Sequence, residues 1–513
     1  MRRILYLAPL LLFIQSIVFG QEDAFNLIFP LEEETLLNTG DGDQLHKEGT
    51  WVSYTKDSSY YQRGNYDNNK REGEWYLYLN RKKRAVMNYE TGVLNGTYVL
   101  FYPNGQSAVV TNFENGKLDG EWRSFTEDGR KFEEGAFSNG QKSSTWVTYH
   151  RSGFGISGSR KAQEANYLNG KLEGEFITYD IYGEVETQTI YKNGLLNGDW
   201  SKRDIDGRII EKGRFVNGVR DGEWTYLYGF RRVQAREFYS MGKKTGEWKE
   251  YDINGRLISS ITYDKDKPIG SSSTFHSNKR LASKTYYKFG LPDSVYREYY
   301  SSGIPAIEGT YQIGLKIGQW KFYHENGLIS EFGQYKTDQK TGNWKFFSQS
   351  GQLRSEGQYL KDKETGQWYN YYENGKLESI GNYTKGERNG LWGFFHLDGE
   401  LMKEETWSNG RLLEITDFKT KRGKTLSSGN LKDGKGDVIN FYPDGTRFSE
   451  GPYQNGYPDG EWKFYDERGR LLTMGLLKEG MKEGEWKVYS MSRRVIKREF
   501  YENGILIDES ENN

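Results

Sequence analysis

The chain has 513 residues, with 71 basic side chains against 72 acidic ones, 5 His and no Cys. This near-neutral balance disfavours a broad nucleic-acid-binding face, which needs a basic surplus. The lack of Cys excludes disulfides, iron–sulfur clusters, thiolate zinc sites and a Cys nucleophile. Aromatic residues make up 16% of the chain and hydrophobic residues only 35%, so we do not expect a thick aliphatic core.

The N-terminus is typical of a signal peptide, residues 1–20. Arg2 and Arg3 precede an apolar run, and Val18 and Gly20 stand at the −3 and −1 positions of a cleavage site. We therefore expect cleavage after Gly20 and export of the chain to a periplasm or to the outside. A retained anchor is the alternative, but the apolar run is shorter than the ~20 residues that a membrane span needs.

After residue 48 the chain is a repeat of about 24 residues, in about 19 units. If the Trp is position 0, Gly recurs at −2 and +7, and aromatic residues recur at +3 and +15. We expect the rings at 0 and +15 to form the structural core, because each can bury roughly 150–250 Å². The Trp residues assigned to this core are Trp75, Trp122, Trp224, Trp248, Trp320, Trp344, Trp368, Trp392, Trp462 and Trp486.

Each unit reads as a β-hairpin. The segment 342–359 predicts a strand, a turn at Ser350-Gly351 and a second strand, and turns such as Asn115-Gly116 lead to the next unit. The predicted fold is all-β, an elongated single-layer antiparallel sheet of stacked hairpins, since one hairpin is not stable alone. Strand alternation places the +3 ring opposite the Trp unless a bulge intervenes, and the sequence leaves this open.

The repeat also suggests domain boundaries. The units around Ser272 and Ile415 depart from the pattern, and we expect bends or weak joints there. The expected segments are a signal peptide (1–20), a linker (21–48), repeats (49–270), a degenerate unit with a bend (271–295), repeats (296–508) and a tail (509–513).

The order Gly-x-Trp-x-x-Tyr, Asn-Gly, Gly-x-Tyr resembles the MORN repeat in its bacterial variant form. Segments such as 318–323, 342–347, 366–371 and 460–465 carry the resemblance, which covers roughly residues 49–508. It implies hairpins in a single layer and a role as a scaffold or interaction module, with lipid binding proposed for some members. Bacterial relatives are often labelled antitoxin-like, which implies a protein partner. The resemblance implies no catalytic residues.

Candidate chemical sites are few. Four of the five His residues share position +4, which suggests either a ladder of metal ligands or a polar strand end; the spacing of roughly 20 Å or more favours the latter. Gly153–Gly158 matches a dinucleotide-binding loop, but no long helix follows it, so we interpret it as a lengthened hairpin loop. The acidic loop 39–43 could contact calcium or be a solvated linker. We expect no catalytic residues, metal or cofactor.

The aromatic residues at +3 form the one candidate binding stripe, and Tyr323, Phe347, Tyr371 and Phe395 are its clearest members. These rings could grip a protein or stack on sugars, or they could simply pack on their neighbours. The sequence predicts a non-enzymatic exported scaffold that binds another protein. A glycan-binding or envelope-binding module is the alternative, and peripheral lipid binding is disfavoured by the acid at −1 in many units.

Overall fold

The computed structural model describes residues 37–40, 46–55, 58–151 and 159–511. The expected signal peptide, the motif Gly153–Gly158 and most of the acidic loop lie outside these residues. The chain forms two compact units, residues 1–246 with 250–255, and residues 247–249 with 256–513.

The described residues are mostly β-strand, and the one helical element among them is a 3-10 turn, η2 (Gly229–Arg231). Strands up to the division are β1 (Leu37–Gly40), β2 (Gly49–Tyr54), β3 (Tyr60–Asp67), β4 (Lys70–Leu79), β5 (Lys82–Glu90), β6 (Val93–Leu94), β7 (Gly96–Phe101), β8 (Ser107–Glu114), β9 (Lys117–Phe125), β10 (Lys131–Ser138), β11 (Gln141–Tyr149), β12 (Lys161–Leu168), β13 (Lys171–Tyr179), β14 (Val185–Lys192), β15 (Leu195–Leu196), β16 (Gly198–Arg203), β17 (Ile209–Val216), β18 (Val219–Tyr228), β19 (Arg232–Ser240) and β20 (Lys243–Tyr251).

The strands after the division are β21 (Leu257–Asp264), β22 (Lys267–Phe275), β23 (Leu281–Lys288), β24 (Leu291–Tyr299), β25 (Pro305–Gln312), β26 (Leu315–Tyr323), β27 (Ile329–Lys336), β28 (Gln339–Phe347), β29 (Leu353–Leu360), β30 (Lys363–Tyr371), β31 (Leu377–Thr384), β32 (Glu387–Phe395), β33 (Leu401–Ser408), β34 (Arg411–Ile415), β35 (Phe418–Lys419), β36 (Thr425–Leu426), β37 (Gly436–Phe441), β38 (Arg447–Gln454), β39 (Tyr457–Pro458), β40 (Gly460–Tyr465), β41 (Leu471–Lys478), β42 (Met481–Tyr489), β43 (Val495–Glu502) and β44 (Ile505–Glu511).

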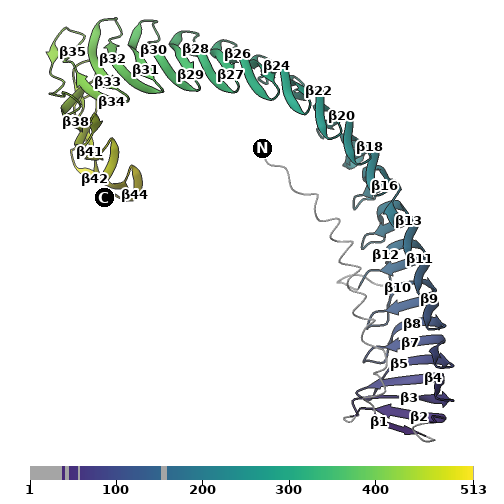
Figure 1. Ribbon diagram of the computed structural model, residues 1–513. Helices are drawn as coiled ribbons and strands as arrows, with labels where there is room; N and C mark the ends of the chain where they lie inside the picture. The colour runs from purple at the N-terminus through teal and green to yellow at the C-terminus, as the bar shows by residue number, and fades with distance from the viewer. Residues whose placement is uncertain (1–36, 41–45, 56–57, 152–158, 512–513) are drawn as a thin grey trace. The chain divides into compact units, whose positions relative to one another are not determined.

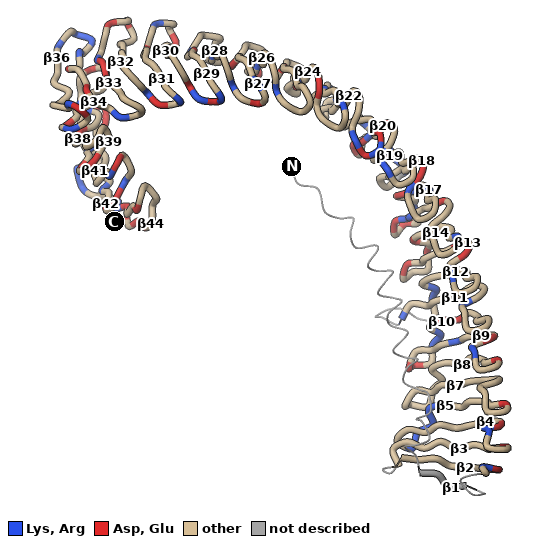
Figure 2. Tube along the Cα trace, viewed as in Figure 1, with Lys and Arg blue, Asp and Glu red and all other residues tan. Residues whose placement is uncertain are grey.

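Within each unit the hairpins stand side by side in chain order (Figure 1). In the first unit β2 pairs with β3 and β3 with β4, and in the second β26, β27, β28 and β29 pair in succession, all antiparallel. The predicted all-β, single-layer antiparallel fold is confirmed. Charges of both signs are interspersed along strands and turns (Figure 2).

The two ends of the hairpins use different turns. Asn115 and Gly116 join β8 to β9 with φ of 50° and 78°, as a type I′ turn requires. At the opposite end, His324 N–H donates to Leu328 O (2.8 Å), and Gly327 N–H donates to His324 O (2.9 Å). Gly327 has a φ of 87°, so the Gly at +7 is needed for the left-handed position of a three-residue loop. We call these the turn edge and the loop edge.

A bulge in the strand pairing precedes the Trp in many units. Between β29 and β30, Glu356 pairs with Tyr369 and Gln358 with Thr365, so Gly366 to Trp368 form extra backbone opposite Gly357. Gly366 has a φ of 64°, which explains the Gly at −2. The bulge carries the Trp ring across the facing strand.

The strand ladder is interrupted after Ile415. β34 is the last strand of one sheet, β35 and β36 pair only with each other, and β37 begins an eight-stranded sheet. A hydrophobic cluster that includes Leu412, Leu431 and Val438 replaces the missing strand pairs. Around Ser272, by contrast, β22 pairs with both β21 and β23, so the ladder continues through this unit. The atypical unit at Ile415 therefore interrupts the ladder, and the one at Ser272 does not.

Candidate binding surfaces

One side of each hairpin carries the Trp rings, and we call it the Trp face. Trp344 is completely buried, and its Nε1 donates to Gln334 O at 3.2 Å. Its ring lies so close over Gly333 that a Cβ there would stand 2.2 Å from Trp344 Cδ2. The same close approach recurs at Gly64, Gly135, Gly213, Gly309, Gly357, Gly381, Gly451 and Gly475. The Gly at +13 thus makes room for the Trp of the next unit.

The aromatic residues at +15 close the gaps between successive Trp rings. Tyr335 meets Trp320 and Trp344 edge-on, with centroid distances of 5.9 and 5.2 Å. Tyr359 repeats this between Trp344 and Trp368, at 6.0 and 5.3 Å. The edge-to-face geometry is the one that aromatic quadrupoles favour. The resulting row of rings buries the Trp residues although the sheet has only one layer.

A cation at −4 covers the outer surface of this row. Lys340 Nζ lies 4.0 Å from the centroid of the Trp344 ring and 3.3 Å from the Glu331 carboxylate. Cation–π contact of this kind stabilises most when the cation is partly desolvated. Equivalent cations over a Trp ring are Arg71, Lys142, Arg220, Lys316, Arg388 and Lys482.

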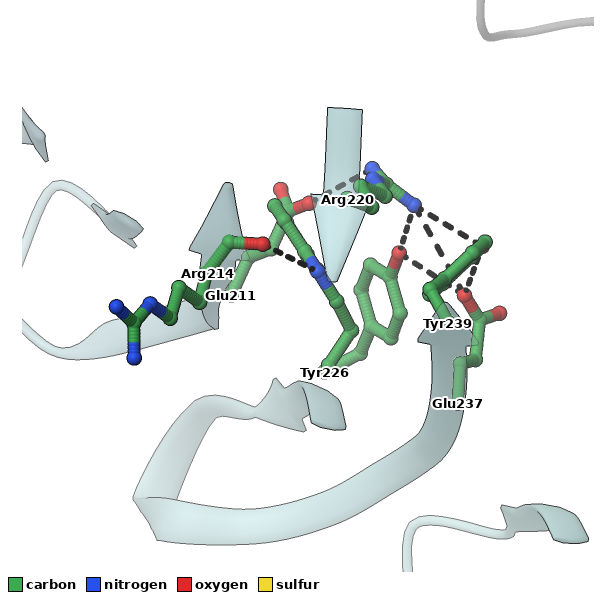
Figure 3. Close-up of polar contacts among 7 residues, drawn as sticks. Glu211, Arg214, Arg220, Tyr226, Glu237 and Tyr239 are labelled. Atoms are coloured by element: carbon green, nitrogen blue, oxygen red, sulfur yellow. Dashed lines mark hydrogen bonds and ion pairs between the residues drawn. The ribbon is translucent and has the colours of Figure 1, made fainter. Parts of the chain in front are cut away.

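A cluster of polar side chains on the Trp face surrounds Arg220 (Figure 3). Its guanidinium lies over the Trp224 ring at 4.1 Å and donates to Tyr226 Oη (2.7 Å) and to Glu211 (3.3 Å). Tyr226 Oη donates in turn to Glu237 at 3.2 Å. Burial raises the pKa of Glu211, although Arg220 opposes this, and burial and then Glu237 raise that of Tyr226. These groups satisfy one another, so the cluster is a structural network.

Glu237 belongs to a set of acids that replace the Gly at +13. Glu405 lies 2.7 Å from Lys403 Nζ and accepts a hydrogen bond from Trp407 Nε1 at 3.0 Å. Glu499 accepts from Tyr501 Oη at 2.8 Å. A carboxylate at +13 lies where Gly admits the next ring, and Trp248, which follows Glu237, is half-buried, unlike the Trp residues that follow a Gly at +13. The unit after Glu405 has Ile415 at position 0, so the row of Trp rings ends there.

The opposite side of the sheet, which we call the Tyr–Glu face, carries the +3 aromatic residues. Tyr323 Oη donates to Glu308 at 2.9 Å, and Glu308 is the neighbour of Gly309, which faces Trp320. Because successive side chains alternate, the +3 ring lies opposite the Trp. The same Tyr-to-Glu bond joins Tyr149 to Glu134, Tyr179 to Glu164, Tyr371 to Glu356 and Tyr465 to Glu450.

These bonds shift the titration of both partners. Burial, and then the Glu308 carboxylate, raise the pKa of Tyr323 to about 12. Burial and Glu356 do the same for Tyr371. A hydrogen bond from Lys345, and then one from Tyr371, hold the pKa of Glu356 below its ordinary value. At neutral pH the face therefore carries neutral phenols bonded to ionised carboxylates.

Comparison with known families agrees with this geometry. The MORN repeat variant model matches residues 94–115, 244–265, 340–361 and 364–385. The predicted resemblance to the MORN repeat variant is confirmed at these four repeat positions. The match at 340–361 begins at the cation over Trp344 and ends in the following two-residue turn, so one MORN unit is one hairpin, here β28 and β29.

The search of curated proteins gave no match. Among solved structures, the crystal structure of TcdB2-TccC3 aligns over 96% of this chain and 34% of that one, with 10% identity and a TM-score of 0.12. A Photorhabdus luminescens Tc holotoxin pore aligns over 91% of this chain and 30% of that one, with 11% identity and a TM-score of 0.10. The chain thus spans about a third of the length of these proteins.

The four residues of the expected stripe occupy consecutive repeat units on the Tyr–Glu face and are all half-buried. Tyr323 and Tyr371 are held by their Glu partners. Phe347 stacks on Phe332, with centroids 6.3 Å apart. Phe395 has no hydroxyl to hold it, and its backbone carbonyl accepts from Tyr372 Oη at 2.8 Å. The rings pack on neighbours and also leave part of their surface accessible.

The His residues at +4 link one MORN unit to the next. Nε2 of His276 and His324 lies 2.8 and 3.1 Å from the carbonyl oxygens of Tyr299 and Phe347, so this nitrogen carries the proton and donates. In other units Tyr takes the same role, as Tyr372 does. His and Tyr thus share the position because both donate to a carbonyl. In the part of the chain that the structure describes, no three His, Asp or Glu residues gather as a metal site would require.

No helix among the described residues is long and apolar enough to span a membrane.

Sequence reasoning placed the Trp rings, but it assigned no role to the Gly at +13 or the cation at −4. Nine of the ten assigned core Trp residues are buried, and Trp248 is half-buried. The sequence held one signal of the contact between the Gly at +13 and the next Trp. In the paired strands β21 and β22, Ile261 replaces this Gly and Ser272 replaces the Trp. The joint loss indicates that the two positions touch.

Proposed function

We propose that the chain is a non-enzymatic, exported scaffold that binds another protein along the Tyr–Glu face. The supporting observation is the row of half-buried rings in consecutive units, among them Tyr323, Phe347, Tyr371 and Phe395. The Tyr side chains are fixed by Glu partners before any partner arrives, so little rotamer freedom remains to be lost on binding. Amphipathic, preorganised rings are the side chains that protein interfaces favour.

The charges around the row favour a protein over an anionic polymer or membrane. Lys345 lies 2.9 Å from Glu356, and Arg297 lies 3.6 Å from Glu308, so cations and anions alternate on this face. Phosphate-rich partners select a surplus of cations. A mixed surface instead suits a protein partner with charges of both signs.

The pairing of ionisable groups supports a non-enzymatic role. Glu211, Arg220 and Glu237 satisfy one another within the Arg220 cluster, and Glu356 is bonded to Tyr371. Catalytic acids and bases must instead be open to a substrate. Export is proposed from the N-terminal sequence alone.

The test is photo-crosslinking of the full chain, with a photoreactive phenylalanine analogue replacing Phe347. We expect a discrete protein adduct from the exported fraction of the native host. Because the proposed partner follows the face, this adduct should be lost when Phe395, two units away, is replaced in Phe395→Ser. Leu397→Ser changes an exposed side chain on the loop edge and should leave the adduct intact.

Two other outcomes would replace the proposal. Sedimentation with purified cell-wall polysaccharide, lost in Phe347→Ser, would make the row a glycan-binding site. Binding to anionic liposomes that salt abolishes would make the chain a peripheral lipid binder. Turnover of a substrate by the purified chain would contradict the non-enzymatic role.

A further inference from the structure

The first two hairpins, β2–β3 and β4–β5, carry a row of three Tyr side chains across neighbouring strands. Tyr54 pairs with Tyr61, and Tyr61 pairs with Tyr78. The rings of Tyr61 and Tyr78 stack with their centroids 4.4 Å apart. Because all three alternate along their strands with buried residues of the Trp face, the row lies on the Tyr–Glu face.

Arg63 stands where other units hold the Glu that accepts a hydrogen bond from the +3 Tyr. That Glu is at +12 of the preceding unit, as Glu308 is for Tyr323. For Tyr78 the same position is Arg63, which is exposed. Among the described residues, no carboxylate accepts from the Tyr78 hydroxyl. The phenol therefore lacks the acceptor that the repeat supplies elsewhere.

The β4–β5 turn adds positive charge beside this row. Lys83 pairs directly with Tyr78, and its Nζ lies 4.7 Å from the centroid of the Phe101 ring. Arg81 and Lys82 are exposed at the tip of the same turn. Three cations thus stand at the end of the row of Tyr rings.

These cations lack the acidic partners that cations on this face have in other units. Arg236 occupies position +12, as Arg63 does, and lies 3.7 Å from Glu223. Neither Arg63 nor the cations of the β4–β5 turn form an ion pair within the part of the chain that the structure describes. Glu74, the acid of this face in β4, is bonded to the hydroxyl of Tyr76. The Tyr–cation patch is defined as Tyr54, Tyr61, Arg63, Tyr78 and Lys83.

We propose that the Tyr–cation patch binds an acidic segment of a protein. The cations have no counter-charge and the Tyr78 hydroxyl has no carboxylate, so a run of Asp or Glu side chains would supply both. Arg63 can bind a carboxylate through two N–H donors, and Tyr78 would donate to it as Tyr323 donates to Glu308. The inference rests on the proposed function in one respect, namely that the ligand is a protein.

The hydroxyl groups favour carboxylates over phosphates as the bound anion. A phosphate-rich polymer or an anionic membrane would be attracted by the same charge, but this attraction requires only cations. The patch combines its cations with phenols, and the equivalent phenols of Tyr323 and Tyr371 donate to carboxylates in this same chain. An extended acidic segment could therefore reproduce a contact that the fold already uses.

The test is fluorescence anisotropy of the full chain with labelled deca-glutamate. We expect saturable binding that weakens as the salt concentration rises. Arg63→Glu should weaken it at least about tenfold, because it reverses one charge and gives Tyr78 an internal acceptor. The thermal midpoint of this variant should stay unchanged, since Glu is the residue at +12 in other units. Loss of folding therefore cannot explain a loss of binding.

Lys212→Glu is the matched control. Lys212 is an exposed cation at +12 in another unit, and it pairs with Ser201 and Thr225 instead of a Tyr. This variant should leave the affinity unchanged. Tyr78→Phe should weaken binding by about twofold to tenfold, the usual effect of one hydrogen bond. Equal losses in Arg63→Glu and Lys212→Glu, or no binding of deca-glutamate, would overturn the proposal.

Two comparisons separate this proposal from its alternatives. Inorganic polyphosphate or phosphatidylglycerol vesicles that bind more tightly than deca-glutamate, and lose this binding in Arg63→Glu, would assign the patch to phosphate groups and overturn the proposal. The crosslink at Phe347 is scored separately. An adduct without deca-glutamate binding refutes the acidic segment alone, and deca-glutamate binding without an adduct refutes the scaffold function alone.

Discussion

Gly333 lies under the Trp344 ring and Gly366 lies two residues before Trp368, and the structure requires Gly at the two positions for different reasons. Gly366 has a φ of 64°, and it shapes the bulge before Trp368. Gly333 is needed because the ring of Trp344 fills the space of a Cβ. A sequence pattern records both simply as recurrent Gly, and only the packing separates them.

Gly333→Ala should therefore lower the free energy of unfolding by about 1–3 kcal/mol, the usual cost of forcing extra volume into a packed core. The displaced ring would also lose its hydrogen bond to Gln334 O. Urea denaturation followed by Trp fluorescence measures the change. Gly229→Ala is the matched control, because nothing lies within 4 Å of a Cβ added there, and an equal loss in both variants would contradict the explanation.

The Tyr-to-Glu bonds predict a response to alkali. Tyr323 has an ordinary pKa of 10.0 that is raised to about 12 in the folded chain. A raised pKa means that the folded state holds the phenolic proton more tightly than the unfolded state. This stabilisation is complete below pH 10 and is lost as the pH rises through about 12.

Titration of tyrosinate absorbance should show a late group of Tyr residues ionising near pH 12, where unfolding sets in. The triple variant Tyr323→Phe/Tyr371→Phe/Tyr465→Phe should lose part of this late group. If all Tyr residues titrate near their ordinary pKa while the chain is still folded, the bonds to Glu do not persist in solution.

At the scale of single elements, side chains join each loop to the next along the loop edge. His324 Nε2 donates to Phe347 O at 3.1 Å, and Asn326 Nδ2 donates to Gln349 O at 2.7 Å. Neighbouring hairpins are thus connected by side chains at the loop edge as well as by strand pairs. The Asn of the recurrent Asn-Gly pair has this second role besides favouring a turn.

His324→Tyr should leave stability almost unchanged, because Tyr372 makes the equivalent bond to the Phe395 carbonyl. His324→Leu should lower it by about 0.5–1.5 kcal/mol, the usual net value of one hydrogen bond. Chemical denaturation of both variants measures the difference. A Tyr variant that loses as much as the Leu variant would show that ring shape, and not donation to the carbonyl, selects the residue.

The hairpins, both kinds of turn and the buried Trp positions could be predicted from the sequence, because period, Asn-Gly pairs and aromatic spacing are local signals. The side of the +3 ring could not, since it depends on bulges whose register is set by strand pairing. The contact of Lys340 with the Trp344 ring was also not predicted, because the sequence alone does not distinguish this Lys from other surface Lys residues. Contacts between units have no local signature within one unit.

At the scale of the whole molecule, the interruption after Ile415 is the place where strand pairing gives way to side-chain packing. Leu412, Leu431 and Val438 are buried in the cluster that joins the β34 end to the β37 sheet. Only a few backbone bonds accompany them, such as Gly434 N–H to Leu413 O at 3.0 Å. In a repeat protein, where each unit contacts its neighbours, such a joint limits cooperativity.

Leu431→Ala should remove about 2–5 kcal/mol from this joint and separate unfolding into two transitions. The eight-stranded sheet β37–β44 should unfold first, because it has the fewer units. Differential scanning calorimetry, with limited proteolysis within residues 416–435, would detect the separation. Leu397→Ala removes an exposed side chain and should leave the transitions unchanged. A single shifted transition for Leu431→Ala would show that the joint is not a boundary of cooperativity.

The order of the strands also decides how the molecule bears mechanical load. Tension applied at β44 acts on one strand pair at a time, so the outermost pair, β43 with β44, yields before the next is stressed. Peeling would proceed in small steps through the β37 sheet until it reaches the packed residues around Leu412, where no further strand pair is directly in line. The C-terminal hairpins can thus unfold one after another and lengthen the chain under tension. The hairpins before Ile415, with their Trp rings, would remain folded meanwhile.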